Sequence, residues 1–507
     1  MSVSRTKRTA ENAIMGFVYQ FITMILGFVS RVVFLRTIGV EFLGLNGIFS
    51  DVLNLLCLAD LGFSTAMSYS FYKPLADGDE ERITALVAFY RKLYNIVALI
   101  VLVCGLCCIP FLKVIVNVQN DIRYLEIYYL FALANVVTSY LFVYKTTLLT
   151  ADQKDYMVIR IRMVINITKV LLQILILIVL KSYMLYLAAD TLMVIVSNII
   201  ATRKAEKEYP YIRNLKDKSV EDVSLKEKIV VNMRSVFIYK VSTTVFSATD
   251  NIIISMVVST VAVGMFGNYL MLSQKLLLME QILFSSMTAS IGNVIAKEND
   301  KKRYEVFKSI QSISLILCGV ITGCYFLLAD DFVRLIFGQE YTLSTMVVCA
   351  VTVNAYFSCA LQPLWLYRDA TGLYRKTKYI MLIATIENIV LSVVLGHVLG
   401  IAGVIFASAI ARLTTYCWYE PKILFKEYFN ESALIYYRDI AVNIILCIFA
   451  IAALSLVTSW IQVTGILMLI IKGGIVACLS FAFFIGVYFN SDGAQNIIAK
   501  IKMMIRR

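Results

Sequence analysis

Uninterrupted apolar runs recur along the whole chain, and many of them are about 20 residues long or longer, enough to cross the ~30 Å hydrocarbon core of a bilayer as a helix. Of the 507 residues, 60% are hydrophobic and 16% are charged. A soluble protein of this length could not bury so much apolar surface. No alternation of period two is present, which argues against a transmembrane β-barrel. The sequence therefore predicts an all-α polytopic membrane protein.

The apolar pattern predicts about fourteen transmembrane helices. The first follows a basic start, and its apolar part is too long for a signal peptide, so we expect it to be retained. The predicted spans are 12–37, 42–72, 83–115, 122–150, 156–180, 183–203, 229–258, 262–292, 304–329, 341–367, 377–396, 401–419, 438–459 and 465–489.

Basic residues fall mainly on one side of these spans. With the N-terminus inside, the segments 203–228, 301–303 and 375–378 are cytoplasmic, whereas the opposite loops hold few Lys or Arg. The positive-inside rule therefore places both termini in the cytoplasm. The net charge of +13 is mostly this bias. No basic soluble domain is present to bind nucleic acid.

The two halves of the chain match weakly at a shift of about 220 residues. Gly44 then falls on Gly264, and Asp60 falls on Glu280. The repeat indicates two six-helix bundles related by a pseudo-two-fold axis along the membrane normal, because an even number of helices per repeat preserves orientation. The predicted domains are the N-terminal bundle (1–206), a cytoplasmic linker loop (207–228), the C-terminal bundle (229–430), and two additional helices with a cytoplasmic tail (431–507).

Polar residues follow one face of the first two helices in each half. Because residues four apart share a helix face, Asp60 belongs to a polar stripe, and Glu280 shares a face with Tyr269 and Ser273. We expect both acids to be architectural, paired for example with a basic neighbour; the alternative is a coupling role as a proton or cation site. The polar lining predicted for a central hydrated cavity is Gln20, Thr23, Asn46, Thr243, Ser247 and Asn251.

Five cations lie deep inside predicted spans. At ~2.5–3.5 kcal/mol each on an insertion scale, they would cost on the order of 10 kcal/mol if they faced lipid. They must therefore be paired, hydrated or both. A structural ion pair remains an alternative interpretation of each cation. Unpaired cations in a cavity would suit phosphate or pyrophosphate. The candidate cavity cations are Arg31, Lys169, Lys240, Lys275 and Arg412.

Several chemistries find no support in the sequence. Histidine-based metal or triad chemistry is nearly excluded, because His397 is the single histidine. The eleven cysteines are interpreted as small buried hydrophobes. No GxxxxGK[ST] motif is present, so an ion gradient, the membrane potential or downstream consumption of the product is the expected energy source. We expect no cofactor and no enzymatic activity.

The stretches "LADLGFSTA" and "YKPLADGD", the latter followed by "YRK", resemble the bacterial polysaccharide-repeat flippases of the Wzx type. These belong to a superfamily that also holds the multidrug MATE exporters and the lipid II flippases. The resemblance covers the whole chain. It implies that an undecaprenyl-pyrophosphate-linked oligosaccharide is flipped across the bacterial cytoplasmic membrane by alternating access, for surface polysaccharide biosynthesis. It also implies a cationic cavity, with Arg31, Lys240 and Arg412 as the best-matched cations.

Two rivals share this superfamily. A lipid II flippase would bind the same pyrophosphate lipid. A cation-coupled drug exporter usually carries an acid in its first helix, whereas residues 13–38 contain none. An integral-membrane glycosyltransferase or polymerase is disfavoured, because the predicted outer loops are short. The expected partners are the lipid-linked glycan, membrane lipids, and a polysaccharide polymerase with other assembly proteins; we expect a monomer.

Overall fold

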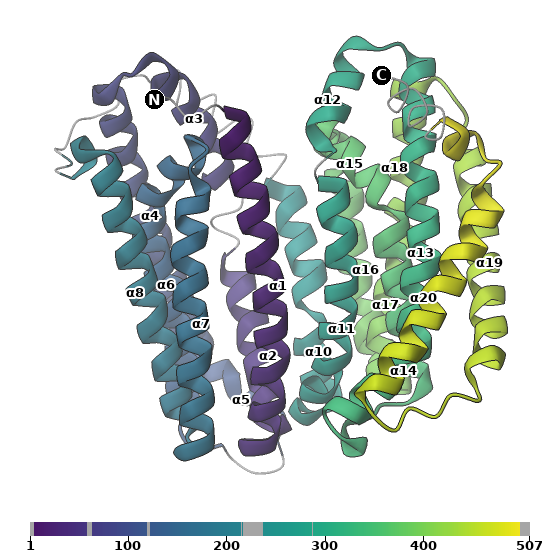
Figure 1. The fold of residues 1–507 in the computed structure, drawn as a ribbon. Coiled ribbons are helices and arrows are strands. Elements are labelled where there is room, and N and C mark those ends of the chain that lie inside the picture. The colour runs from purple at the N-terminus through teal and green to yellow at the C-terminus, as the bar shows by residue number, and fades with distance from the viewer. Residues whose placement is uncertain are drawn as a thin grey trace. The chain divides into compact units, whose positions relative to one another are not determined.

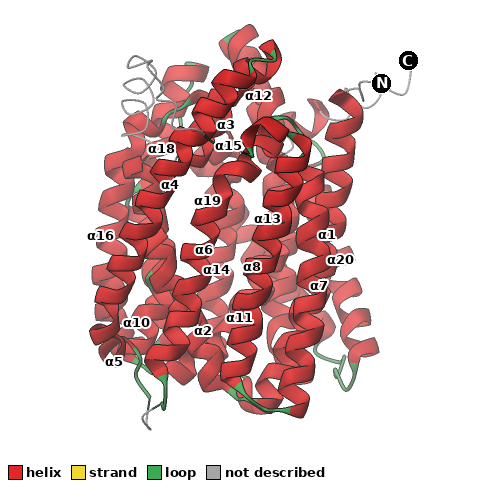
Figure 2. Cartoon of the chain, turned by 90° about the vertical axis from the view of Figure 1, so that its left-hand side faces the viewer, coloured by secondary structure: helices red, strands yellow, loops and turns green. Residues whose placement is uncertain are grey.

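The protein is seen in a computed structural model that describes residues 5–57, 63–118, 122–213, 215, 237–285 and 287–496. Within these ranges every regular element is a helix, as Figure 2 shows. The all-α prediction is confirmed. The chain divides into two compact units, Met1–Thr244 with Ser259–Val261, and Val245–Val258 with Ala262–Arg507. Each unit is described by itself, and the predicted domain boundaries stay predictions.

In the first unit, long helices run side by side (Figure 1). Helix α1 packs against α7, and α6 packs against α4 and α8. Local sequence sets where some of them begin: the Asp79 carboxylate caps α4, and the Ser182 hydroxyl caps α8. The elements are α1 (Arg5–Thr37), α2 (Val40–Leu56), α3 (Phe63–Asp77), α4 (Glu80–Cys108), η2 (Ile109–Phe111), α5 (Leu112–Ile115), α6 (Leu125–Ala151), α7 (Asp155–Val179), α8 (Tyr183–Glu208) and η3 (Pro210–Ile212).

In the second unit, α13 packs against α14, α19 and α20, and α16 packs against α17. Residues 237–248 are also helical and span the boundary between the units. The elements are α10 (Asp250–Val257), α11 (Thr260–Ser285), α12 (Thr288–Lys297), α13 (Asp300–Ile336), η4 (Gln339–Tyr341), α14 (Thr345–Ala360), α15 (Gln362–Thr371), α16 (Tyr374–Leu399), α17 (Ile401–Thr414), α18 (Tyr416–Leu424), the π-helix η5 (Phe425–Phe429), α19 (Leu434–Thr458) and α20 (Ile466–Tyr488).

Within the described ranges, eleven helical segments are long and apolar enough to cross a membrane, and α14 with α15 counts as a twelfth if the bent pair is one span. The break, a bend of 41°, differs from the continuous span expected over 341–367. Its cause is Pro363, which lacks a backbone N–H and starts a new helix. The expected spans 42–72 and 229–258 run through residues outside the described ranges, so the count of fourteen stays a prediction.

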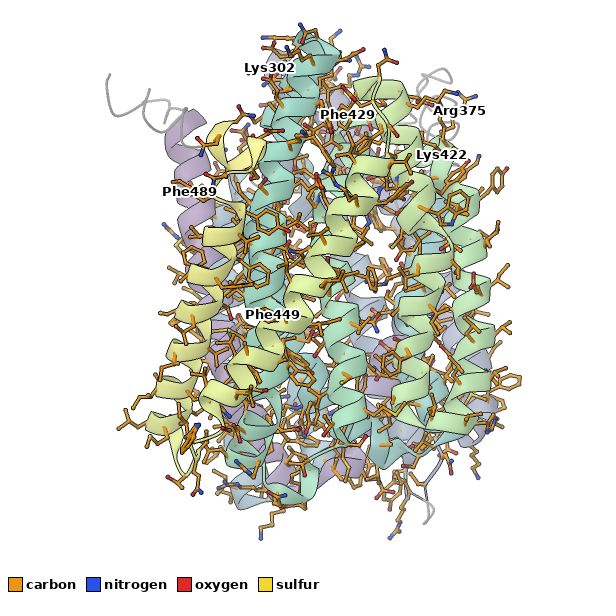
Figure 3. The ribbon with its side chains drawn as sticks, turned by 90° about the vertical axis from the view of Figure 1, so that its right-hand side faces the viewer. Lys302, Arg375, Lys422, Phe429, Phe449 and Phe489 are labelled. Atoms are coloured by element: carbon orange, nitrogen blue, oxygen red, sulfur yellow. The ribbon has the colours of Figure 1, made fainter. Side chains whose placement is uncertain are left out.

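Large apolar side chains cover the outside of the second unit. Figure 3 shows Phe449 on α19 and Phe489 at the end of α20, whose side chains are 61% and 52% exposed. Such surfaces are disfavoured in water and suit lipid chains. Lys302, Arg375 and Lys422 lie at one end of the same unit, beyond the apolar band. The chain is a multi-pass membrane protein.

Candidate functional site

Helix α1 has the polar face that the sequence predicts. Gln20, Thr23 and Arg31 are half-buried, whereas Phe21 and Ile25 on the opposite side are exposed. The Thr23 hydroxyl donates a 2.7 Å hydrogen bond to the Tyr19 carbonyl of its own helix. That this face of α1 lines a cavity stays a prediction.

The first unit neutralises one of the five candidate cations. The Lys169 ammonium on α7 lies 2.9 Å from one carboxylate oxygen of Asp190 on α8. The other carboxylate oxygen accepts a 2.6 Å hydrogen bond from the Asn135 amide on α6. Tyr186, one turn before Asp190, interacts electrostatically with both Asp190 and Arg31. Lys169 and Arg31 thus belong to one polar cluster that links α1, α6, α7 and α8.

Asn46, a predicted lining residue, is held by a tyrosine. Its side-chain carbonyl accepts a 2.6 Å hydrogen bond from the Tyr183 hydroxyl, and the Tyr183 ring packs edge-on against Phe34 and Tyr128. The sequence does not single out Tyr183, because nothing in its pattern distinguishes it from the other tyrosines among the thirty of the chain.

A second charged cluster joins the ends of α6 and α8. Lys145 pairs with Glu206, and the Lys154 ammonium lies 2.8 Å from Asp152 and 2.6 Å from Glu208. Burial acts to lower the pKa of Lys154, but its hydrogen bonds to Asp152 and Glu208 outweigh burial and raise the pKa. These cations are satisfied by carboxylates and serve to join the helix ends.

Arg412 on α17 has a different environment. Its guanidinium donates a 2.8 Å hydrogen bond to the Ser358 hydroxyl on α14 and lies 5.5 Å from the centre of the Phe246 ring. Its Nε is buried without a hydrogen-bond partner, and no carboxylate pairs with the guanidinium in the described ranges. Arg412 is therefore an arginine inside the membrane domain that keeps donor capacity available for an anion.

Further polar residues meet between α10, α16 and α17. The Ser408 hydroxyl lies 3.3 Å from both carboxylate oxygens of Asp250 and accepts a 2.8 Å hydrogen bond from the Asn388 amide. Ser408 is an isolated polar residue in an apolar run, and Asn388 directly follows Glu387 inside the predicted span 377–396; a polar residue at such depth is the signal that could have found them.

A buried ion pair was also missed. Arg368 on α15 donates hydrogen bonds of 3.3 and 3.4 Å to the Glu420 carboxylate on α18, and both residues are buried. The predicted spans ended one residue short of each partner, at Tyr367 and Tyr419, so the two charges were taken to lie outside the apolar segments.

Glu280 on α11 does not have the basic partner that we expected. Its side chain is 2% exposed and shares a buried face with Tyr269 and Ser273, as predicted. However, its carboxyl oxygens accept no hydrogen bond from a nitrogen or oxygen donor in the described ranges, and the thiols of Cys318 and Cys359 are the groups that interact with it. Lys275, the nearest cation on α11, lies on another face of the helix, so the architectural role expected for Glu280 stays a prediction.

Of the remaining predicted residues, all but Asp60 lie in described helical segments. Lys240 is half-buried in the helical segment 237–248, where its carbonyl accepts a 2.9 Å hydrogen bond from the Thr243 hydroxyl. Lys275 is half-buried on α11. Asp60 lies outside the described residues. The other predicted lining residues, Ser247 and Asn251, lie in the segment 237–248 and in α10.

No protein-family model matches the sequence, and no curated protein matches it. Solved structures do match the fold. Lipid II flippase MurJ in an inward closed conformation has a TM-score of 0.66 at 16% identity, over 94% of this chain and 100% of that chain. An inward-facing multidrug resistance MATE transporter of the MOP superfamily has a TM-score of 0.57 at 14% identity, over 79% and 95%. A MATE transporter from Vibrio cholerae has a TM-score of 0.56 at 14% identity, over 83% and 99%. The fold is therefore MurJ- and MATE-like.

Proposed function

We propose that this protein is a flippase that moves a polyprenyl-pyrophosphate-linked oligosaccharide from the cytoplasmic to the outer leaflet of a bacterial cytoplasmic membrane by alternating access. The glycan would serve the synthesis of a surface polysaccharide. The observation that carries the proposal is Arg412, which has no carboxylate partner in the described ranges and is held by Ser358 and Phe246. A guanidinium in such a place binds phosphate oxygens bidentately.

The other candidate cations differ from Arg412 in their surroundings. Lys169 is neutralised by Asp190, which favours a structural role. Arg31 shares a cluster with Tyr186 and is half-buried on the polar face of α1. We therefore assign pyrophosphate binding to Arg31, Lys240 and Arg412, with Lys275 as a further candidate along the substrate's path.

The membrane topology and partners complete the proposal. Both termini are cytoplasmic, because the basic residues concentrate on that side. The protein acts as a monomer, without a catalytic step or a cofactor, and is driven by an ion gradient, by the membrane potential or by consumption of the product. A polysaccharide polymerase and other assembly proteins receive the flipped glycan.

A second candidate function is flipping of lipid II. The likeness to lipid II flippase MurJ covers 94% of this chain and favours it. A cation-coupled drug exporter is disfavoured, because Arg412 has no acid partner within the described residues and the described part of α1 beyond Ala13 carries no carboxylate.

The test is to identify what the purified protein carries. Full-length protein is extracted from its native membrane, and bound lipids are analysed by mass spectrometry. We expect a polyprenyl-pyrophosphate oligosaccharide, with at least about tenfold less in Arg412→Ala and an intermediate amount in Arg412→Lys, since tenfold corresponds to ~1.4 kcal/mol of binding. Lys181→Ala, which removes a cation in a predicted outer loop, is the matched control. Recovery of lipid II identifies the second candidate, and equal recovery from Arg412→Ala and wild type contradicts the role of Arg412.

A further inference from the structure

Glu280 combines three features that rarely occur together. It is an ionisable residue within a membrane-spanning helix, its side chain is 2% exposed, and both of its carboxyl oxygens are buried without a nitrogen or oxygen hydrogen-bond donor in the described ranges. An ionised carboxylate in such a place would be neither hydrated nor paired. The protonated, neutral acid therefore has a lower free energy at this position than the ionised carboxylate.

The groups that face Glu280 come from two neighbouring helices. The thiol of Cys359 on α14 and the thiol of Cys318 on α13 interact with the carboxyl group, and both cysteines are themselves buried. Lys275 precedes Glu280 by five residues on α11, which places it about 140° around the helix. Arg412 binds Ser358, the neighbour of Cys359, and consecutive residues point about 100° apart on a helix. Among the residues that the structure describes, no charged side chain is placed to compensate an ionised Glu280.

Away from Glu280, α11 is hydrogen-bonded to α13 at Tyr269. The Tyr269 hydroxyl donates a 2.6 Å hydrogen bond to Asp330 on α13, and the Tyr325 hydroxyl donates a 3.2 Å hydrogen bond to the Tyr269 carbonyl. Tyr269 lies eleven residues from Glu280, which is about 16 Å along the helix. At Glu280 itself, the neighbouring polar groups are weakly hydrogen-bonding thiols. The Glu280 end of α11 is therefore the end that is easier to move away from α13 and α14.

We propose that Glu280 is a proton-binding site, at which the carboxylic acid keeps its proton while α11, α13 and α14 enclose it and releases that proton to water when α11 moves away. The O–H bond of the acid breaks, water accepts the proton, and the carboxylate that remains is hydrated. The proposal concerns the protein alone and does not depend on which substrate is transported.

Infrared spectroscopy of the purified full-length protein tests the protonation, because the C=O band of a carboxylic acid is separate from the carboxylate bands. At about pH 7, where an unperturbed Glu is ionised, we expect an acid band in wild type that Glu280→Gln lacks. Asp330→Asn is the matched control: Asp330 accepts a hydrogen bond from Tyr269, and the asparagine keeps an acceptor there. The control should retain the acid band.

An acid band of unchanged intensity in Glu280→Gln, or a loss confined to the carboxylate bands, would overturn the proposal. Glu280→Asp keeps an acid with one methylene less, so the band should persist in this variant. It provides the comparison if Glu280→Gln does not accumulate.

A second experiment tests proton release through Cys359. Ten of the eleven cysteines are replaced, and the rate of maleimide labelling at Cys359 is measured against pH. Thiolate formation alone raises this rate about tenfold per pH unit while the thiol is mostly protonated. In a protein that retains Glu280 we expect a steeper rise, because ionisation of Glu280 also opens the pocket to water. With Glu280→Gln the rise should return to about tenfold; equal slopes in both proteins contradict the release step.

Discussion

Lys169 and Asp190 form an ion pair of 2.9 Å that joins α7 to α8. The Asn135 amide donates a hydrogen bond to the same carboxylate, so both of its oxygens are engaged. Arg412 in the second unit has a serine hydroxyl and an aromatic ring as its neighbours instead. Lys169 and Arg412 look alike in the sequence, but Lys169 is neutralised by a carboxylate and Arg412 has no carboxylate partner in the described ranges. This difference decides which of them can bind an anion.

Lys169→Met should destabilise the protein, because it leaves the Asp190 carboxylate without its counter-ion inside the membrane domain. Breaking a buried pair costs about 3–5 kcal/mol, and the side chains here are about one quarter exposed, so we expect the lower end of that range. Thermal unfolding of the purified variant measures the effect.

The double variant Lys169→Met/Asp190→Leu is the control for this pair. Removing both charges removes the penalty of an unpaired one, so the melting temperature should recover most of the loss. A double variant that is less stable than Lys169→Met would show that Asp190 stabilises the fold independently of Lys169.

The sequence predicted the helices well because a membrane span needs a long apolar run, which is visible residue by residue. It could place Arg412 and Glu280 inside spans for the same reason. It could not say that Arg412 lies against Ser358 and Phe246, or that Glu280 faces thiols, because these neighbours come from distant segments of the chain. The bend before Pro363 is a local feature that the apolar pattern concealed.

Arg31→Ala and Lys240→Ala should each reduce export of the surface polysaccharide at least about tenfold while protein stays in the membrane. A pyrophosphate that crosses a region of low dielectric needs compensating charge, and tenfold is ~1.4 kcal/mol. Arg31→Lys and Lys240→Arg should be milder, although lysine lacks the guanidinium fork. Surface glycan and membrane protein are quantified together; normal export in both alanine variants would end the cationic-cavity hypothesis.

Asp60→Asn should show a different pattern. If Asp60 pairs with a neighbouring cation, the variant leaves that cation unpaired, so expression and export should fall together. Quantifying surface glycan and membrane protein together tests this expectation. Full expression without export would instead make Asp60 a proton or cation site that takes part in transport.

The segment between the two predicted bundles should be cytoplasmic. Asp217→Cys, in a cysteine-free background, should resist an impermeant thiol reagent in intact cells and react once the membrane is opened, because basic residues concentrate in 203–228. Lys181→Cys in a predicted outer loop is the matched control and should react in intact cells. Labelling of the 217 position in intact cells would reverse the proposed orientation.

Ionisation of Tyr211, in η3 after α8, should lower the stability of the protein at high pH. Burial, together with Glu80 and Asp152, raises the pKa of Tyr211 to about 12, whereas an unfolded tyrosine has a pKa of about 10. The unfolded chain therefore loses this proton first, and the stabilisation is fully present below pH ~10 and is lost as the pH rises toward ~12. Denaturation of Tyr211→Phe should show a smaller loss over this window than wild type. Tyr379→Phe, at an exposed ring on α16, is the control.

Gly319 should be irreplaceable where α13 meets α20. A Cβ at this position would lie 2.0 to 2.3 Å from three ring atoms of Phe484, whose side chain is 0% exposed and has no room to withdraw. Gly319→Ala should therefore lower the stability by about 1–3 kcal/mol through overpacking, measured by thermal unfolding, and Phe484→Leu in the same chain should restore part of it. Gly474 on α20 is the matched control, because a Cβ there meets nothing within 4 Å; Gly474→Ala should be neutral or slightly stabilising, since alanine favours a helix. If the two alanine variants melt alike, the contact between Gly319 and Phe484 does not hold α20 in place.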